Sequence, residues 1–109
     1  GMHMEFVCGR IKLHSGPRRS LHRPSVDILF ESLGDVAPRV HAVLLSGMGD
    51  DGTQGMTSLR TAGAVTMVQD EPSSVVWGMP GAVARAGLAS AVLPLEDIAP
   101  HVARLAKGR

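Results

Sequence analysis

The chain has 109 residues, of which 44% are hydrophobic and 19% charged, and its formal net charge is +1. This balance is typical of one small folded domain and excludes a disordered chain or a strongly basic nucleic-acid-binding surface. The single cysteine excludes an internal disulfide framework and a cysteine-built zinc site, and 3% aromatic residues are too few for a base-stacking module. We expect a cytoplasmic protein without membrane insertion.

The first third of the chain predicts a hairpin, a basic loop and a helix. Residues 5–14 contain two short β-like runs around Gly9. Residues 15–24, here called the basic loop, contain two prolines, three arginines and a histidine, and predict an exposed irregular segment. From Ser25, taken as the N-cap, apolar residues at helical spacing predict a helix that Gly34 and Pro38 end.

From residue 39 onward the pattern alternates between strand and helix. Residues 39–46 form a continuous apolar run, which is typical of a strand buried on both faces of a parallel sheet. After a glycine-rich loop, the pattern predicts a helix, a strand, a helix, a short apolar segment and a closing amphipathic helix, over residues 53–63, 64–69, 81–87, 90–95 and 96–107. We therefore expect an α/β fold: a partial doubly wound, mostly parallel sheet flanked by helices, with a short N-terminal hairpin.

The loop after the first long strand, "SGMGDDG" (residues 46–52, here called the glycine loop), lies where such a sheet gathers its functional groups. It has the G-x-G-x-x-G spacing of a dinucleotide-binding loop, formed by Gly47, Gly49 and Gly52, and two acidic residues at 70–71 stand where a ribose-binding acid is expected. However, Asp50 and Asp51 would lie against the pyrophosphate, at a cost of about 1–4 kcal/mol each. Dinucleotide binding is therefore the weakest alternative.

The two aspartates admit other roles. As metal ligands they lack a nearby histidine or a spaced acidic ladder, so we expect no metal. Either of them could cap the helix that begins near Thr53. An aspartate on a strand–helix turn could also orient the imidazole of a Ser–His pair, and this alternative concerns Asp51.

Four ordered segments, "HRPSVDILFESL", "LLSGMGDDG", "AGAVTMVQDE" and "SSVVWGMPGAV", resemble the C-terminal catalytic domain of the chemotaxis protein-glutamate methylesterase (CheB) family. The resemblance covers essentially the whole chain. It implies a Ser–His–Asp triad whose aspartate is Asp51, with Met48 bordering the site in the same glycine loop. It also implies hydrolysis of receptor glutamate methyl esters, with glutaminyl deamidation as a further activity, a methyl-accepting chemotaxis receptor as partner, and no cofactor.

The chain departs from the family pattern in one respect. The family's serine lies in an "STGG"-like turn and its histidine in a "QHMP"-like segment, and neither motif occurs here. We therefore expect residues 1–109 to be the C-terminal portion of such a domain, without a receiver domain and inactive by itself. His22, Ser25 and Asp27 do not replace the missing pair; their spacing predicts a local capping arrangement.

Two further expectations concern surfaces. Three arginines of the basic loop, Arg18, Arg19 and Arg23, are either a solvated cluster or face an acidic, glutamate-rich receptor helix. The alternative to catalysis is a non-catalytic half-domain that forms dimers or binds a partner or the missing half, because a parallel sheet cut near its middle exposes an apolar edge.

Overall fold

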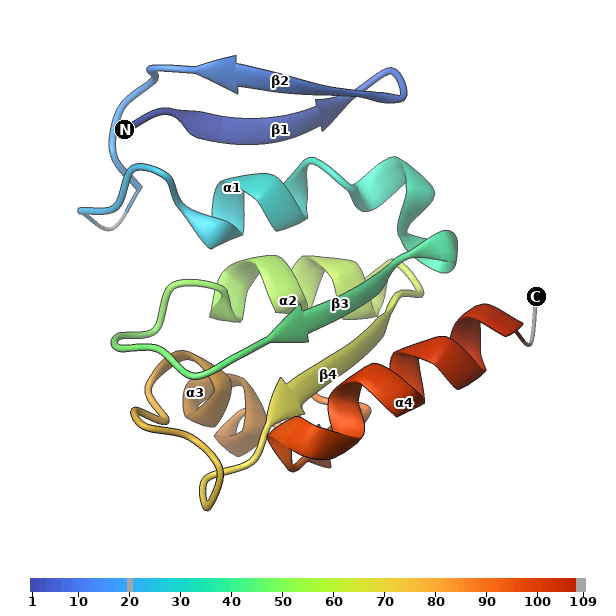
Figure 1. The fold of residues 1–109 in the computed structure, drawn as a ribbon. Helices are drawn as coiled ribbons and strands as arrows, with labels where there is room; N and C mark the ends of the chain where they lie inside the picture. The colour runs from blue at the N-terminus through green and yellow to red at the C-terminus, as the bar shows by residue number, and fades with distance from the viewer. Residues whose placement is uncertain (20, 108–109) are drawn as a thin grey trace.

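The computed structural model describes residues 1–19 and 21–107, and its order of elements confirms the predicted alternation (Figure 1). Its elements are β1 (His3–Val7), β2 (Arg10–His14), α1 (Val26–Glu31), the 3-10 helix η1 (Gly34–Arg39), β3 (His41–Leu44), α2 (Thr53–Thr61), β4 (Val65–Gln69), α3 (Met79–Arg85), β5 (Ala91–Leu93) and α4 (Leu95–Lys107). The expected α/β fold class is confirmed. In the described part of the chain, no helix has the length and apolar character needed to cross a membrane.

The central sheet is parallel, in the order β3-β4-β5. His41 lies opposite Val65, and Met67 lies opposite Ala91. In Figure 1, α2 and α3 lie behind this sheet and α4 lies on the side of β4 away from β3. Because the strands are parallel, the loops that follow β3 and β4 both leave the sheet at its carboxyl end. The candidate site lies at this end of the sheet.

The hairpin predicted around Gly9 is confirmed and lies apart from the central sheet. Strands β1 and β2 pair antiparallel, and their turn uses positive φ angles of 49° at Cys8 and 79° at Gly9. The hairpin lies on α1, where the backbone N–H of Phe6 donates to Ser32 Oγ at 2.8 Å. The start of β1 is thereby brought beside the start of α1.

The hydrophobic core fills the space between the sheet and the helices behind it. Met56 and Leu59 of α2, Val68 of β4 and Val83 of α3 are all fully buried in it. Burying one such side chain contributes about 1.5–3 kcal/mol. Helix α2, which follows the glycine loop, is therefore anchored in the core.

Two predicted elements differ from the structure. The first helix ends at Glu31, and the expected stop signals at Gly34 and Pro38 lie within η1 instead. The hydroxyl of Ser32 donates to Leu29 O at 2.6 Å, which competes with the regular helical bonds. Strand β3 is shorter than residues 39–46, and Val43 is only half-buried because β3 is an edge strand of the sheet.

Candidate functional site

The glycine loop connects β3 to α2 and is held in place by the segment before α3. The N–H of Gly47 donates to Val76 O at 2.8 Å, and the N–H of Gly78 donates to Gly47 O at 2.9 Å. A Cβ on Gly78 would lie 2.7 Å from Gly47 O and 2.7 Å from Gly49 N. This close backbone contact requires glycine at position 78.

A buried glutamine joins the carboxyl ends of β3 and β4. Gln69 Oε1 accepts the N–H of Ser46 at 2.8 Å, and Gln69 Nε2 donates to Ser73 O at 2.7 Å. The indole Nε1–H of Trp77 donates to Gln69 O at 2.7 Å. The start of the glycine loop is therefore fixed from the neighbouring strand.

The carboxylate of Asp51 is buried, with 4% of the residue exposed, and lies at the amino end of α1. Asp51 Oδ1 accepts the hydroxyl of Ser25 at 2.8 Å and the N–H of Asp27 at 3.3 Å, and Oδ2 accepts the N–H of Val26 at 2.7 Å. Burial disfavours the charged form, but these hydrogen bonds outweigh it and hold the pKa of Asp51 below its ordinary value. Asp51 is therefore an ionised buried acceptor at neutral pH.

The carboxylate of Asp27 makes the opposite connection. From the first turn of α1 its Oδ1 accepts the N–H of Gly52 at 3.0 Å and the N–H of Gly55 at 2.7 Å, both at the amino end of α2. Burial raises the pKa of Asp27, and the neighbouring charge of Asp51 raises it further against these two bonds. Asp27, in α1, thus bonds the amino end of α2, and Asp51, which precedes α2, bonds the amino end of α1. We call these two residues the crossed carboxylates.

The crossed carboxylates correct two predictions. Neither Asp50 nor Asp51 caps α2 with its side chain; Gly52 is the N-cap residue, and Asp51 bonds α1 instead. Ser25 is the N-cap residue of α1, as predicted, but it makes no side-chain cap bond there: the local bonding predicted for the trio at 22–27 is wrong, because Ser25 donates to Asp51 and Asp27 accepts from α2. In both cases a tertiary partner takes the place of the sequence neighbour.

The same contacts oppose dinucleotide binding. In a dinucleotide site, backbone N–H groups at the amino end of the helix bind the pyrophosphate. Here the N–H groups of Gly52 and Gly55 already donate to Asp27. The acid at position 70, expected to bind a ribose, accepts the N–H and hydroxyl of Ser73 at 3.1 and 2.6 Å.

A buried histidine supports Ser25 from the hairpin. His3 is fully buried, and its Nδ1 accepts the N–H of Ser25 at 3.2 Å. Its Nε2 therefore carries the proton and donates it to Pro17 O at 2.8 Å. No local sequence pattern indicates this role, because the partners of His3 lie 14 and 22 positions away along the chain.

The middle of the glycine loop, residues 48–50, lies at the surface, whereas Gly52 is buried. Met48 is 78% exposed, and Asp50 is exposed beside it. Gly49 and Gly52 adopt positive φ angles of 88° and 108°, which side-chain-bearing residues rarely adopt. The glycines thus turn the chain so that Met48 projects outward while Asp51 is buried.

The structure separates the three arginines of the basic loop; Ser20 between them lies outside the described residues. Arg18 is exposed, whereas Arg23 is half-buried and donates to Gly16 O at 3.4 Å. Arg19 makes a two-pronged ion pair with Glu31 at 2.9 and 2.8 Å and also contacts Gln54. A role in substrate binding stays a prediction, with Arg18 as the least engaged of the three.

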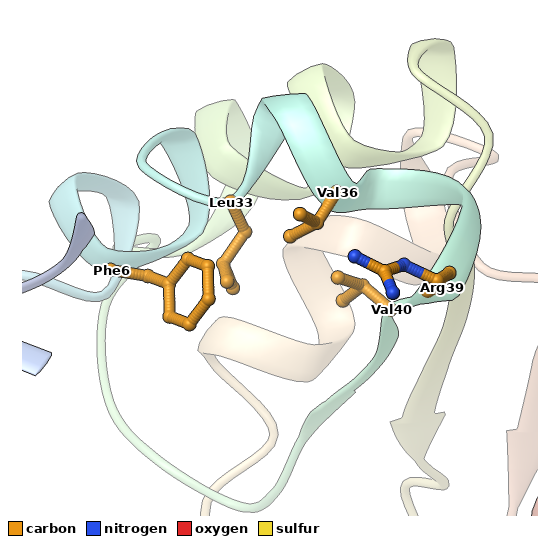
Figure 2. A pocket seen from close by; sticks show the side chains of 5 residues that line it. All are labelled: Phe6, Leu33, Val36, Arg39 and Val40. Atoms are coloured by element: carbon orange, nitrogen blue, oxygen red, sulfur yellow. The ribbon is translucent and has the colours of Figure 1, made fainter. Parts of the chain in front are cut away.

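A separate pocket of about 350 Å³ lies at the other end of β3. Figure 2 shows apolar side chains from the hairpin and from the segment before β3 directed into one space, with an arginine at the rim. It is lined by Phe6, Leu33, Val36, Arg39 and Val40. The chemistry of this pocket is that of an apolar packing surface rather than of a reaction centre.

The number of free acceptor positions on Asp51 indicates which chemistry this carboxylate can perform. A carboxylate offers about four lone-pair positions. Donors among residues 1–19 and 21–107 use three of those on Asp51, two on Oδ1 and one on Oδ2, which leaves one on Oδ2 for a further donor. A buried, ionised and rigidly held carboxylate with one open acceptor position is suited to accept an imidazole N–H and to stabilise the imidazolium.

Comparison with known proteins gives a consistent result. A family model described as CheB methylesterase matches residues 1–102. A protein-glutamate methylesterase/protein-glutamine glutaminase from Rhodospirillum rubrum is 51% identical over 100 residues, covering 91% of this chain and 26% of its own length. A protein of the same name from Xanthomonas campestris is 46% identical over 110 residues, covering 96% of this chain and 31% of its own length.

The solved structures give a match of the same kind. The crystal structure of the Thermotoga maritima CheB methylesterase catalytic domain superimposes with a TM-score of 0.86 at 29% identity. The match covers 95% of this chain and 57% of that one. The chain thus spans just over half of that domain and less than a third of the full length of the two relatives named above.

Proposed function

Because the chain belongs to the CheB methylesterase family, we propose that it contributes Asp51 as the orienting carboxylate of a site that hydrolyses receptor glutamate methyl esters. The observation that carries this proposal is the open acceptor position on the buried, ionised carboxylate of Asp51. The carboxylate is supplied by the loop after a parallel strand, as the α/β architecture favours. The substrate is a protein, and the setting we infer is the cytoplasm.

In the proposed reaction this chain supplies Asp51, and a separate segment supplies the serine and the histidine. The serine hydroxyl attacks the ester carbonyl while the histidine removes its proton, and methanol leaves with that proton. Water then attacks the acyl-serine, with the histidine again as base, and releases the glutamate carboxylate. Asp51 accepts the other imidazole N–H throughout and does not itself take the proton. Glutamine deamidation follows the same course with ammonia as leaving group.

A chimera tests the proposal. Residues 1–102 replace the corresponding part of the Rhodospirillum rubrum relative, and methanol release from methylated receptor is measured. We expect activity in the chimera, a loss of about 10³–10⁴-fold in Asp51→Asn, and little change in the matched control Asp50→Asn. A folded but inactive chimera, or equal effects of the two substitutions, contradicts the proposal. Methanol release by the 109-residue chain alone would show that the nucleophile lies within it.

One observation favours a second role, binding of a partner. Strand β3 lies at an edge of the sheet, and Leu45 and Val75 near its carboxyl end are exposed. The apolar pocket of Figure 2 lies at its amino end. In this role the surface pairs with a second copy or with the missing part of the domain. Sedimentation decides this point, because a strict monomer at high concentration that also fails to bind the separate segment contradicts it.

A further inference from the structure

The contacts around Asp51 depend on a second residue. Asp51 precedes Gly52, so the peptide N–H of Gly52 is the one that joins directly onto Asp51. That N–H donates to Asp27 Oδ1 at 3.0 Å, while the N–H of Asp27 donates to Asp51 Oδ1 at 3.3 Å. The side chain of each residue therefore accepts a backbone N–H at or directly after the other residue.

We propose that Asp27 is the positioning residue of Asp51: its Oδ1 fixes the Asp51–Gly52 peptide, so that the open acceptor position of Asp51 keeps one direction. This inference rests on the proposed function, because it concerns how the orienting carboxylate is aimed. Asp27 is buried, and both of its acceptor contacts are to backbone N–H groups of the loop end and the first turn of α2. It does not bond the open position itself.

Close approach of the two helices makes this arrangement possible. A Cβ on Gly55 would lie 2.6 Å from Phe30 Cβ, 3.1 Å from Asp27 Cα and 3.2 Å from Asp27 Oδ1. The absence of a side chain at position 55 thus lets Asp27 reach the amino end of α2. Substitution of Gly55 displaces Asp27 without removing its carboxylate, which provides an independent test.

Both bonds that close the amino end of α2 are accepted by one oxygen of Asp27, Oδ1. Two buried carboxylates side by side repel each other, and an asparagine would accept the same two bonds through its Oδ1 without that repulsion. The geometric role therefore depends on the oxygen acceptor rather than on the charge. This separates the expected behaviour of Asp27→Asn from that of Asp27→Ala.

The first test uses amide hydrogen exchange in the 109-residue chain. The reporter is the N–H of Val26, which bonds Asp51 Oδ2 and is not itself bonded to the Asp27 side chain. Relative to Val68 in β4, we expect exchange at Val26 to be about tenfold or more faster in Asp27→Ala and in Gly55→Ala. In Asp27→Asn it stays near the wild-type rate.

The control is Thr66→Val, which removes a different buried hydrogen bond. Thr66 Oγ1 donates to Leu88 O at 2.6 Å, on the strand next to β3 and away from the crossed carboxylates. This variant is destabilised, yet its exchange at Val26 relative to Val68 is expected to be unchanged. The proposal is overturned if Val26 in Asp27→Ala exchanges at the wild-type rate. It is also overturned if Asp27→Asn and Asp27→Ala accelerate exchange at Val26 equally. If Asp27→Ala does not fold, Gly55→Ala and Asp27→Asn decide it by the same comparison.

The second test uses the chimera and measures kcat and KM. We expect Asp27→Ala to lower kcat by about 10- to 100-fold with KM unchanged, whereas Asp27→Asn and Thr66→Val keep most of the activity. If exchange at Val26 changes but kcat does not, the aim of Asp51 does not serve the reaction and the proposal is overturned. If the wild-type chimera is inactive, the proposed function fails while the exchange test still decides whether Asp27 positions Asp51.

Discussion

Replacement of Asp51 by asparagine is expected to destabilise the chain through the amino end of α1. If the amide oxygen keeps the bonds from Ser25 Oγ and Asp27 N, the amide NH₂ faces the N–H of Val26 at the position where an acceptor stood 2.7 Å away. The reversed orientation places the NH₂ against the other two donors instead. At least one buried donor is thus left without an acceptor in either orientation.

The magnitude follows from these contacts. An unsatisfied buried N–H costs about 1–3 kcal/mol, and the remaining bonds lose the strengthening that the charge provides. Relief of repulsion with Asp27 offsets part of this loss, so we expect a decrease of about 2–3 kcal/mol in the free energy of unfolding. At about 4–8 °C per kcal/mol, the melting temperature falls by about 8–24 °C.

The measurement is thermal and urea unfolding followed by circular dichroism at neutral pH. The control is Asp50→Asn, because Asp50 is exposed and its substitution is expected to change the free energy of unfolding by no more than about 0.5 kcal/mol. Equal stability of the two variants would refute the bonding described for Asp51. Because Asp51→Asn also serves in the chimera, its folded fraction must be measured before any loss of methanol release is assigned to chemistry.

Three further predictions concern acid, the glycine loop and the basic loop. The raised pKa of Asp27 makes the native state gain stability as pH falls toward about 4, whereas stability from the lowered pKa of Asp51 is lost as pH falls through that pKa. Asp27→Asn should abolish the gain and shift the Asp51 loss to lower pH, and acid titrations identical to wild type would contradict the coupling. Gly78→Ala should cost about 1–3 kcal/mol in urea unfolding, because its Cβ meets backbone atoms at 2.7 Å; wild-type stability would show that the loop yields freely. Arg18→Glu should weaken association with receptor without changing stability. Arg19→Glu should weaken it too and also lower the melting temperature, because it breaks the ion pair with Glu31. If receptor association is unchanged in both variants, the basic loop has no role in substrate binding.

The sequence predicted those features that depend on neighbouring residues. The hairpin around Gly9 and the strand–helix alternation after residue 39 follow from local periodicity and turn residues, and the structure confirms them. Chain order also places the glycine loop at the carboxyl end of a parallel strand. The location of Asp51 at the carboxyl end of the sheet could therefore be predicted. Its role in the triad came from the family resemblance and stays a prediction.

The partners of Asp51 could not be predicted in the same way. Capping preference assigns an aspartate to the helix that follows it, but Asp51 bonds residues 24 to 26 positions earlier in the chain. The contact exists because α1 packs against α2, and no local pattern encodes that packing. The edge position of β3 is also set by strand order, which the alternation of elements leaves open.

The fit of Gly55 against α1 restricts how this protein can diverge. A methyl group at position 55 would lie 2.6 Å from Phe30 Cβ and 3.1 Å from Asp27 Cα, and a smaller side chain at position 30 keeps the first atom as long as it is not glycine, so a substitution at position 55 requires α1 and α2 to move apart. That movement would separate Asp27 from the amino end of α2 and so lose the alignment of the crossed carboxylates. We expect glycine to persist at position 55 among descendants of this sequence for as long as Asp27 closes α2, and the exposed position 50 to vary freely.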